Sequence, residues 1–309
     1  MKKLKIIGQS GSYHGTMSFV RFTFILMIFL LISTSSKSQY LSRTLSNITE
    51  VKMDLSTPSA HYKAMFGIGD DNSGIIKAVN RFGNLTIDPM GNSKVVKYAD
   101  EEQILYILDG TGILSYGKEK VPVSKNDFIY IPVGTKFGFY NPREKLLSVM
   151  VMGFKISPET VVQPTKKLMI ANADEVSFQI LGSHGPTTQF QLLMGTTQST
   201  RDRLSAAYQA NSLFVMDFNV NGTNIPHKHN DEEEIYFILR GQGDIVAGET
   251  EDGKEYRHPS KAGDAFFFSP KTLIGFYSGN KEGEAHAQIL AVRFKYPSQP
   301  RNQAENKQK

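Results

Sequence analysis

The sequence predicts an all-β protein in which one domain is repeated along the chain. After the first 38 residues, short apolar runs rich in β-branched and aromatic residues alternate with Gly, Asn, Asp and Pro. Few stretches have the 3.6-residue period of a helix. The best is 200–210, with a weaker one in part of 164–174, and we expect short helices there. Strands should therefore dominate both halves.

The second observation behind this fold class is an internal repeat. DEEQILYILDGTG (100–112) and SKNDFIYIPVGTKFGFYN (124–141) return in the second half as DEEEIYFILRGQG (231–243) and SKAGDAFFFSPKTLIGFYSGN (260–280). Each copy has a run that is apolar on both faces, as strands buried on two sides must be. Each also has glycines that suit a tight hairpin. Both copies should fold as β domains of the same kind.

Residues 1–38 have the pattern of a secretory signal peptide. Lysines stand at positions 2, 3 and 5, Arg21 precedes the apolar run 24–32, and small or polar residues follow. The run is shorter than the ~20 residues that span a membrane, so an uncleaved anchor is the weaker alternative. We expect the mature protein to be secreted or periplasmic.

The net charge excludes some partners. The leader holds five of the 35 Lys and Arg residues and none of the 30 Asp and Glu, so the mature chain is balanced and the pI of 9.1 belongs to the leader. A nucleic-acid partner is not expected, nor a membrane after signal cleavage. The absence of cysteine excludes disulfides and thiolate zinc sites.

The two copies resemble the cupin superfamily, and specifically a bicupin with two tandem cupin domains. The family pattern is His-x-His, a Glu, a Gly seven residues later, then Gly-Asp and Pro. Here NGTNIPHKHNDEEEIYFILRG (221–241) is followed by AGDAFFFSP (262–270). The resemblance covers about residues 50–295. It implies two jelly-roll barrels, also called double-stranded β-helices, with ligands pointing inward. The domains would be a signal peptide (1–38), an N-terminal cupin without metal ligands (39–157), a linker (158–175), a metal-binding C-terminal cupin (176–297) and a disordered tail (298–309).

His227, His229 and Glu234 are the candidate metal ligands. Residues two apart on a strand project from one face, so the two imidazoles should lie together. Asn230 and Asp231 permit a turn that brings Glu234 back to the same interior, and Glu234 has the family spacing of seven residues to Gly241. Two imidazoles and a carboxylate suit one divalent ion, Fe, Mn, Ni or Zn. The alternative is a solvated acidic loop.

Two departures from the family pattern weaken this site. The slot of the usual fourth ligand holds Ile274 or Gly275, neither of which can coordinate a metal. His286, in the next apolar run, is a candidate replacement or else an ordinary strand histidine. In the first copy Val96, Tyr98 and Gln103 stand in the three ligand positions, and Phe137 stands in the last. That copy should be a structural barrel or a metal-free pocket in which Tyr98 and Gln103 bind a small ligand.

The resemblance implies a metal-dependent enzyme of the dioxygenase, lyase or isomerase type. Its substrate would be a small organic acid, a phenolic or a sugar derivative, with Glu234 and Tyr236 as catalytic residues. The alternative is a non-catalytic cupin that binds a small molecule or carbohydrate, for instance an accessory to extracellular polysaccharide breakdown. The two barrels can pair within one chain, so we expect a monomer or a homodimer.

Overall fold

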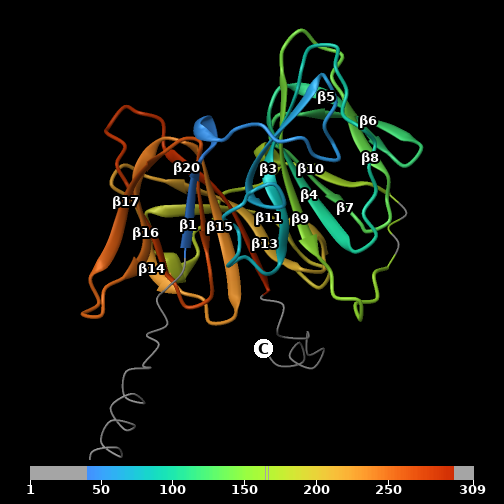
Figure 1. Ribbon diagram of the computed structural model, residues 1–309. Coiled ribbons are helices and arrows are strands. Elements are labelled where there is room, and N and C mark those ends of the chain that lie inside the picture. Colours follow the sequence, from blue (N-terminus) through green and yellow to red (C-terminus); the bar gives the residue numbers. More distant parts are fainter. Residues whose placement is uncertain (1–39, 164, 166, 296–309) are drawn as a thin grey trace, which may run out of the picture. The chain divides into compact units, whose positions relative to one another are not determined.

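A computed structural model describes residues 40–163, 165 and 167–295 (Figure 1). The predicted signal peptide and the predicted tail lie outside these residues. The described part confirms the all-β prediction: it has twenty strands, and its helices are three short 3-10 turns, η1 (Leu45–Asn47), η2 (Ala173–Glu175) and η3 (Gly182–His184). None of the described helices is long and apolar enough to cross a membrane.

The first repeat forms a six-stranded and a three-stranded sheet with apolar side chains of both in one core. The larger sheet has the order β10-β7-β4-β9-β3-β2 and the smaller one β6-β5-β8. The strands are β2 (Ala60–Gly67), β3 (Val79–Ile87), β4 (Glu101–Asp109), β5 (Thr111–Tyr116), β6 (Glu119–Ser124), β7 (Asp127–Ile131), β8 (Phe137–Tyr140), β9 (Leu147–Lys155) and β10 (Met169–Asn172).

The second repeat has the same plan. A seven-stranded sheet, β1-β18-β15-β20-β13-β11-β12, shares a core with a four-stranded sheet, β14-β19-β16-β17. The strands are β1 (Tyr40–Thr44), β11 (Thr188–Thr196), β12 (Leu204–Ala207), β13 (Ala210–Phe218), β14 (Thr223–Lys228), β15 (Glu232–Arg240), β16 (Gln242–Glu249), β17 (Glu255–Lys261), β18 (Asp264–Phe268), β19 (Leu273–Ser278) and β20 (Ala287–Lys295).

Edge strands are exchanged between the two repeats. β1 precedes the first repeat but pairs with β18 of the second, and β10 precedes the second repeat but pairs with β7 of the first. The sheets therefore depart from the predicted boundaries. The segment predicted as a linker contains a strand of the first sheet, and the predicted N-terminal domain contributes a strand to the second.

The predicted helix at 200–210 is wrong. Leu204–Ala207 form β12, which runs parallel to β11, and β13 begins at Ala210. The weaker helical stretch within 164–174 contains β10 and the single 3-10 turn η2. In both places tertiary pairing overrides the local helical preference of alanine-rich sequence.

A third core joins the two large sheets and explains why the central strands are apolar on both faces. It contains residues of both repeats, and Phe66 contacts Phe267 while Phe154 contacts Phe294, with ring centroids 6.2 and 5.0 Å apart. Central strands such as β4 thus have one face in their own barrel and the other in this shared core. The apolar runs in the sequence predicted that these strands are buried on both faces, and the structure has them so.

Two equivalent glutamates bind the backbone of the opposite repeat. Glu102 accepts hydrogen bonds from the N–H groups of residues 208, 209 and 210 at 2.8, 2.8 and 3.0 Å. Glu233, at the same place in the second repeat, accepts them from Lys77 and Ala78, both at 3.2 Å. Both carboxylates are fully buried, and burial raises the pKa of each, that of Glu233 to about 7. The contacts are reciprocal, because each glutamate binds the backbone that leads into β13 or β3 of the opposite repeat.

Candidate metal centre

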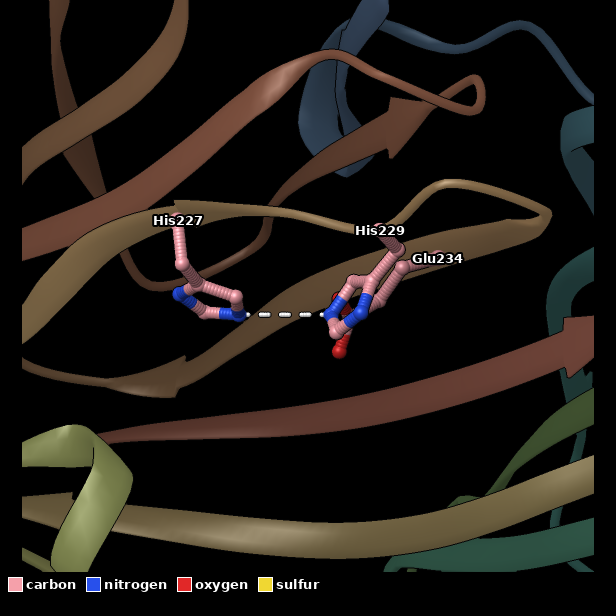
Figure 2. A group of neighbouring side chains, drawn as sticks. All are labelled: His227, His229 and Glu234. Carbon is pink, nitrogen blue, oxygen red and sulfur yellow. Dashed lines mark hydrogen bonds and ion pairs between the residues drawn. The ribbon is translucent and has the colours of Figure 1, made fainter.

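His227, His229 and Glu234 converge at the start of the second barrel's central strand (Figure 2). His227 lies on β14, His229 follows that strand, and Glu234 lies on β15 after a short turn. His227 Nε2 is 3.2 Å from His229 Nε2, which is 3.1 Å from Glu234 Oε2. The predicted geometry, with both histidines on one side and the glutamate returning to them, is what the structure has.

This group fits a metal ion. Ligand atoms about 2.0–2.2 Å from one ion, at right or tetrahedral angles, lie about 3 Å from each other. Glu234 is only 1% exposed, and within the described part of the chain its Oε2 has no hydrogen-bond partner, although His229 Nε2 lies 3.1 Å away. A buried carboxylate oxygen without a donor is costly. A cation between the three ligand atoms would remove that cost.

The surroundings prepare the imidazoles for coordination. His227 Nδ1 lies 2.9 Å from the carbonyl oxygen of Ile225, so the tautomer that donates there leaves the Nε2 lone pair free. Burial lowers the pKa of His227, which favours the neutral form that a metal requires. His229 Nδ1 lies 3.6 Å from Glu232 Oε2, and Arg293 Nε lies 3.1 Å from the same oxygen. Glu232 is thus an outer residue of the site.

His184 is a site residue that the sequence did not reveal. It ends η3, its ring meets that of His227 at a centroid distance of 5.1 Å, and its Nδ1 lies 2.8 Å from Asn224 Oδ1. Asn224 Nδ2 in turn donates to the hydroxyl of Tyr236 at 3.0 Å. His184 stands about 40 residues before the motif, so no spacing could have signalled it. Tyr236, predicted as catalytic, lines the pocket but is buried, and burial raises its pKa well above 10.

His286 does not join the group, contrary to its proposal as a replacement ligand. Its Nδ1 lies 2.6 Å from Asp217 Oδ1, and its side chain is half-exposed. The residue of β20 that faces Glu234 is Arg293. His286 is seven residues away from Arg293, which is about 23 Å along an extended strand. Ile274 faces His227 across the β14–β19 pair and is buried, so the usual fourth position carries no ligand.

A small pocket opens at the three ligands. One part of its wall is polar and contains Arg201, Ser212, Arg293, His184, Asn224 and Tyr236 in addition to the ligands. The rest is apolar and consists of Leu181, Phe190, Leu192, Phe214 and Met216. The wall of the pocket thus has a polar and an apolar part, as ligand sites in proteins commonly have.

In the first barrel a guanidinium group occupies the corresponding place. Arg81, 5% exposed, binds Glu101 through Nε at 2.5 Å and Asp54 and the Tyr98 hydroxyl through Nη1 at 3.0 Å each. Tyr98 is the residue that stands where the second barrel has His229. Gly153 makes the room, because a Cβ there would lie 2.0 Å from Glu101 Oε1 and 2.6 Å from Arg81 Cγ. The first barrel thus holds an ion-paired guanidinium at this place.

The topology and the inward-pointing group define a protein with the cupin fold. Comparison with known proteins agrees: residues 84–153 match the family model described as "Cupin domain". That match lies within the first barrel, whereas the three candidate ligands belong to the second.

Solved structures resemble both barrels together. A putative glyoxylate-induced protein from Pseudomonas aeruginosa is 13% identical, with a TM-score of 0.67 over 86% of this chain and 94% of the other. Protein YlbA from E. coli is 14% identical, with a TM-score of 0.63 over 85% and 93%. A mutant oxalate decarboxylase from Bacillus subtilis is 11% identical, with a TM-score of 0.60 over 82% and 76%. No curated protein sequence matches significantly.

Proposed function

We propose that the protein is a secreted or periplasmic metal-dependent enzyme that binds one divalent ion through His227, His229 and Glu234. The observation that carries the proposal is Glu234 Oε2, a buried carboxylate oxygen without a hydrogen-bond partner among the described residues. It lies 3.1 Å from His229 Nε2, which is itself 3.2 Å from His227 Nε2. The signal-peptide pattern of residues 1–38 supports export. The small size of the pocket supports a substrate that is a small organic acid, a phenolic or a sugar derivative.

A bound ion would supply Lewis-acid chemistry to a substrate or water, or oxygen chemistry if it were iron. The chain's own residues supply the rest. With Nδ1 held by Asn224, His184 has Nε2 free as a proton acceptor, and burial lowers its pKa so that it is neutral at pH 7. Tyr236 keeps its proton and can donate a hydrogen bond. The apolar wall excludes water from this side of the site.

Metal content tests the proposal directly. Protein stripped with a chelator and titrated with Zn(II), Mn(II), Fe(II) and Ni(II) should bind one equivalent of ion per chain, measured by elemental analysis and calorimetry. His227→Ala and Glu234→Ala should bind at least about tenfold more weakly. His286→Ala is the matched control, because that histidine lies at the other end of β20 and should leave binding unchanged. Equal metal content in all four proteins would contradict the site.

A non-catalytic cupin that binds a small molecule or carbohydrate is the second candidate. Two observations favour it: the fourth ligand position is filled by the buried Ile274, and the first barrel has a guanidinium where a metal would stand. In this case the metal-free protein should bind its ligand as tightly as the metal-loaded protein. For an enzyme, turnover should disappear in His227→Ala while the fold persists.

A further inference from the structure

Each barrel places an arginine beside the same glutamate of the repeat, but from different strands. In the first barrel Arg81 of β3 pairs with Glu101, and in the second Arg293 of β20 pairs with Glu232. Glu101 and Glu232 each begin the central strand, β4 or β15. The two barrels can therefore be compared directly, since Arg81 lies in the barrel without the three candidate ligands and Arg293 lies in the barrel that has them.

The two arginines differ in how many of their N–H groups have a hydrogen-bond acceptor in the protein. In Arg81, Nε and both Nη groups have hydrogen-bond acceptors in Glu101, Asp54 and Tyr98. The described residues give Arg293 a single close contact, between Nε and Glu232 Oε2 at 3.1 Å, and none of them accepts a hydrogen bond from its Nη groups. Arg81 thus has the contacts of a structural residue. Arg293 keeps one edge of its guanidinium free.

That free edge belongs to the pocket. Arg293 faces Glu234 across the β15–β20 pair, and it shares the inward face of β20 with Ile289 and Ala291 of the barrel core. Its side chain is 25% exposed and lines the pocket beside the three ligands. Arg201 lines the same pocket, donates through Nη2 to Ser212 Oγ at 3.1 Å and pairs with Asp202 through Nε at 3.3 Å. Two arginines therefore line a pocket whose lining also includes a set of apolar side chains.

We propose that Arg293 is the specificity-determining residue of this site and binds the carboxylate of a small acid whose body is apolar. A guanidinium edge presents two parallel N–H donors that match a carboxylate. Arg201 adds positive charge at the same mouth, and the apolar wall that includes Phe190, Phe214 and Met216 receives the rest of the molecule. This inference deepens the proposed function, on which it rests for the place of the substrate, and selects the organic acids among its substrate classes.

The experiment compares probes that differ in charge. Calorimetry of the metal-free and the Zn(II)-loaded full chain should give phenylacetate and hexanoate at least about tenfold tighter binding than phenylacetamide and hexanamide, because a charged hydrogen-bonded pair is lost in the amides. Arg293→Met should abolish this preference and retain one equivalent of metal. Arg293→Lys should keep part of it. Arg257→Met, an exposed arginine on β17 of the same barrel, is the control and should keep all of it.

Three results would overturn the inference: equal binding of acid and amide by the unaltered protein, an undiminished preference in Arg293→Met, or tighter binding of phenyl phosphate than of every carboxylate. If Arg293→Met fails to fold, Arg293→Lys tests the same residue, and equal binding of acid and amide by the unaltered chain refutes the inference without any variant. His227→Ala separates this inference from the proposed function. If metal binding fails in every protein while His227→Ala and the unaltered chain still prefer the acid, the metal site is wrong and the anion site stands.

Discussion

Glu233 should give the stability of the protein a pH dependence whose size follows from its environment. Its side chain is fully buried, and its two oxygens accept N–H bonds from Lys77 and Ala78 of the other repeat. Desolvation outweighs those bonds and raises the pKa from 4.5 to about 7. The folded state therefore holds this proton more tightly than the unfolded state does. The contribution to stability is complete below pH 4.5 and is lost as the pH rises through about 7.

A difference of about 2.5 pH units, at about 1.4 kcal/mol per unit, corresponds to about 3.5 kcal/mol, of which about 3 kcal/mol is lost between pH 4.5 and pH 8. Glu233→Gln resembles the protonated form at every pH and should lack this dependence. Urea denaturation at pH 4.5 and pH 8 gives the free energy of unfolding of both proteins. The value for the unaltered protein minus that for Glu233→Gln should fall by about 3 kcal/mol between the two pH values. Glu175→Gln, in an exposed ion pair with Arg203, is the control and should show no such change. A difference that stays constant within about 1 kcal/mol would refute the reasoning.

Two further predictions concern the first barrel. Arg81→Met leaves Glu101 buried without its cation and should lower the free energy of unfolding by about 3–5 kcal/mol, while Arg203→Met, in an exposed pair, should cost at most about 1 kcal/mol, both by urea denaturation. Gly153→Ala places a Cβ 2.0 Å from Glu101 Oε1 and should cost about 1–3 kcal/mol or more; Gly74→Ala, where a Cβ meets nothing within 4 Å, should be close to neutral by the same measurement. Equal losses within either pair of variants would count against the buried guanidinium.

The sequence was sufficient for the fold class because the signal was repeated. Apolar runs on both faces, hairpin glycines and a Pro after the strand appear in both copies, and they predict strands whose two sides are buried. The exchange of β1 and β10 could not be predicted from the sequence, because no residue pattern in an edge strand indicates which sheet it will pair with. The helix predicted at 200–210 was wrong for a related reason. The backbone of 208–210 is held by Glu102, which lies about 100 residues earlier in the chain.

For the candidate site, the residue spacing within the motif predicted the ligands in that motif but none of the site residues outside it. His227, His229 and Glu234 lie on two adjoining segments, so parity and one turn bring them together. His184 reaches the site from a 3-10 turn before β11, and Arg293 reaches it by pairing with β15. Such neighbours depend on tertiary register, which one sequence does not reveal. His286 shows the converse: a histidine on the adjacent apolar run was too far along the strand to contribute.

The divergence of the two barrels has a consistent electrostatic explanation. Each has a glutamate at the start of its central strand, the buried Glu101 or the partly buried Glu232, and a carboxylate removed from water requires a partner. In the first barrel the partner is Arg81, which fills the centre and needs the space left by Gly153. In the second, the arginine has moved to β20, and the centre is left to the three ligands. An arginine on β3 and an ion at the centre would compete for one place, so the ligands and the position of the arginine should change together. Placing Ser at position 81 should therefore open the first barrel without creating a metal site, because Val96, Tyr98 and Gln103 offer no ligand set for one.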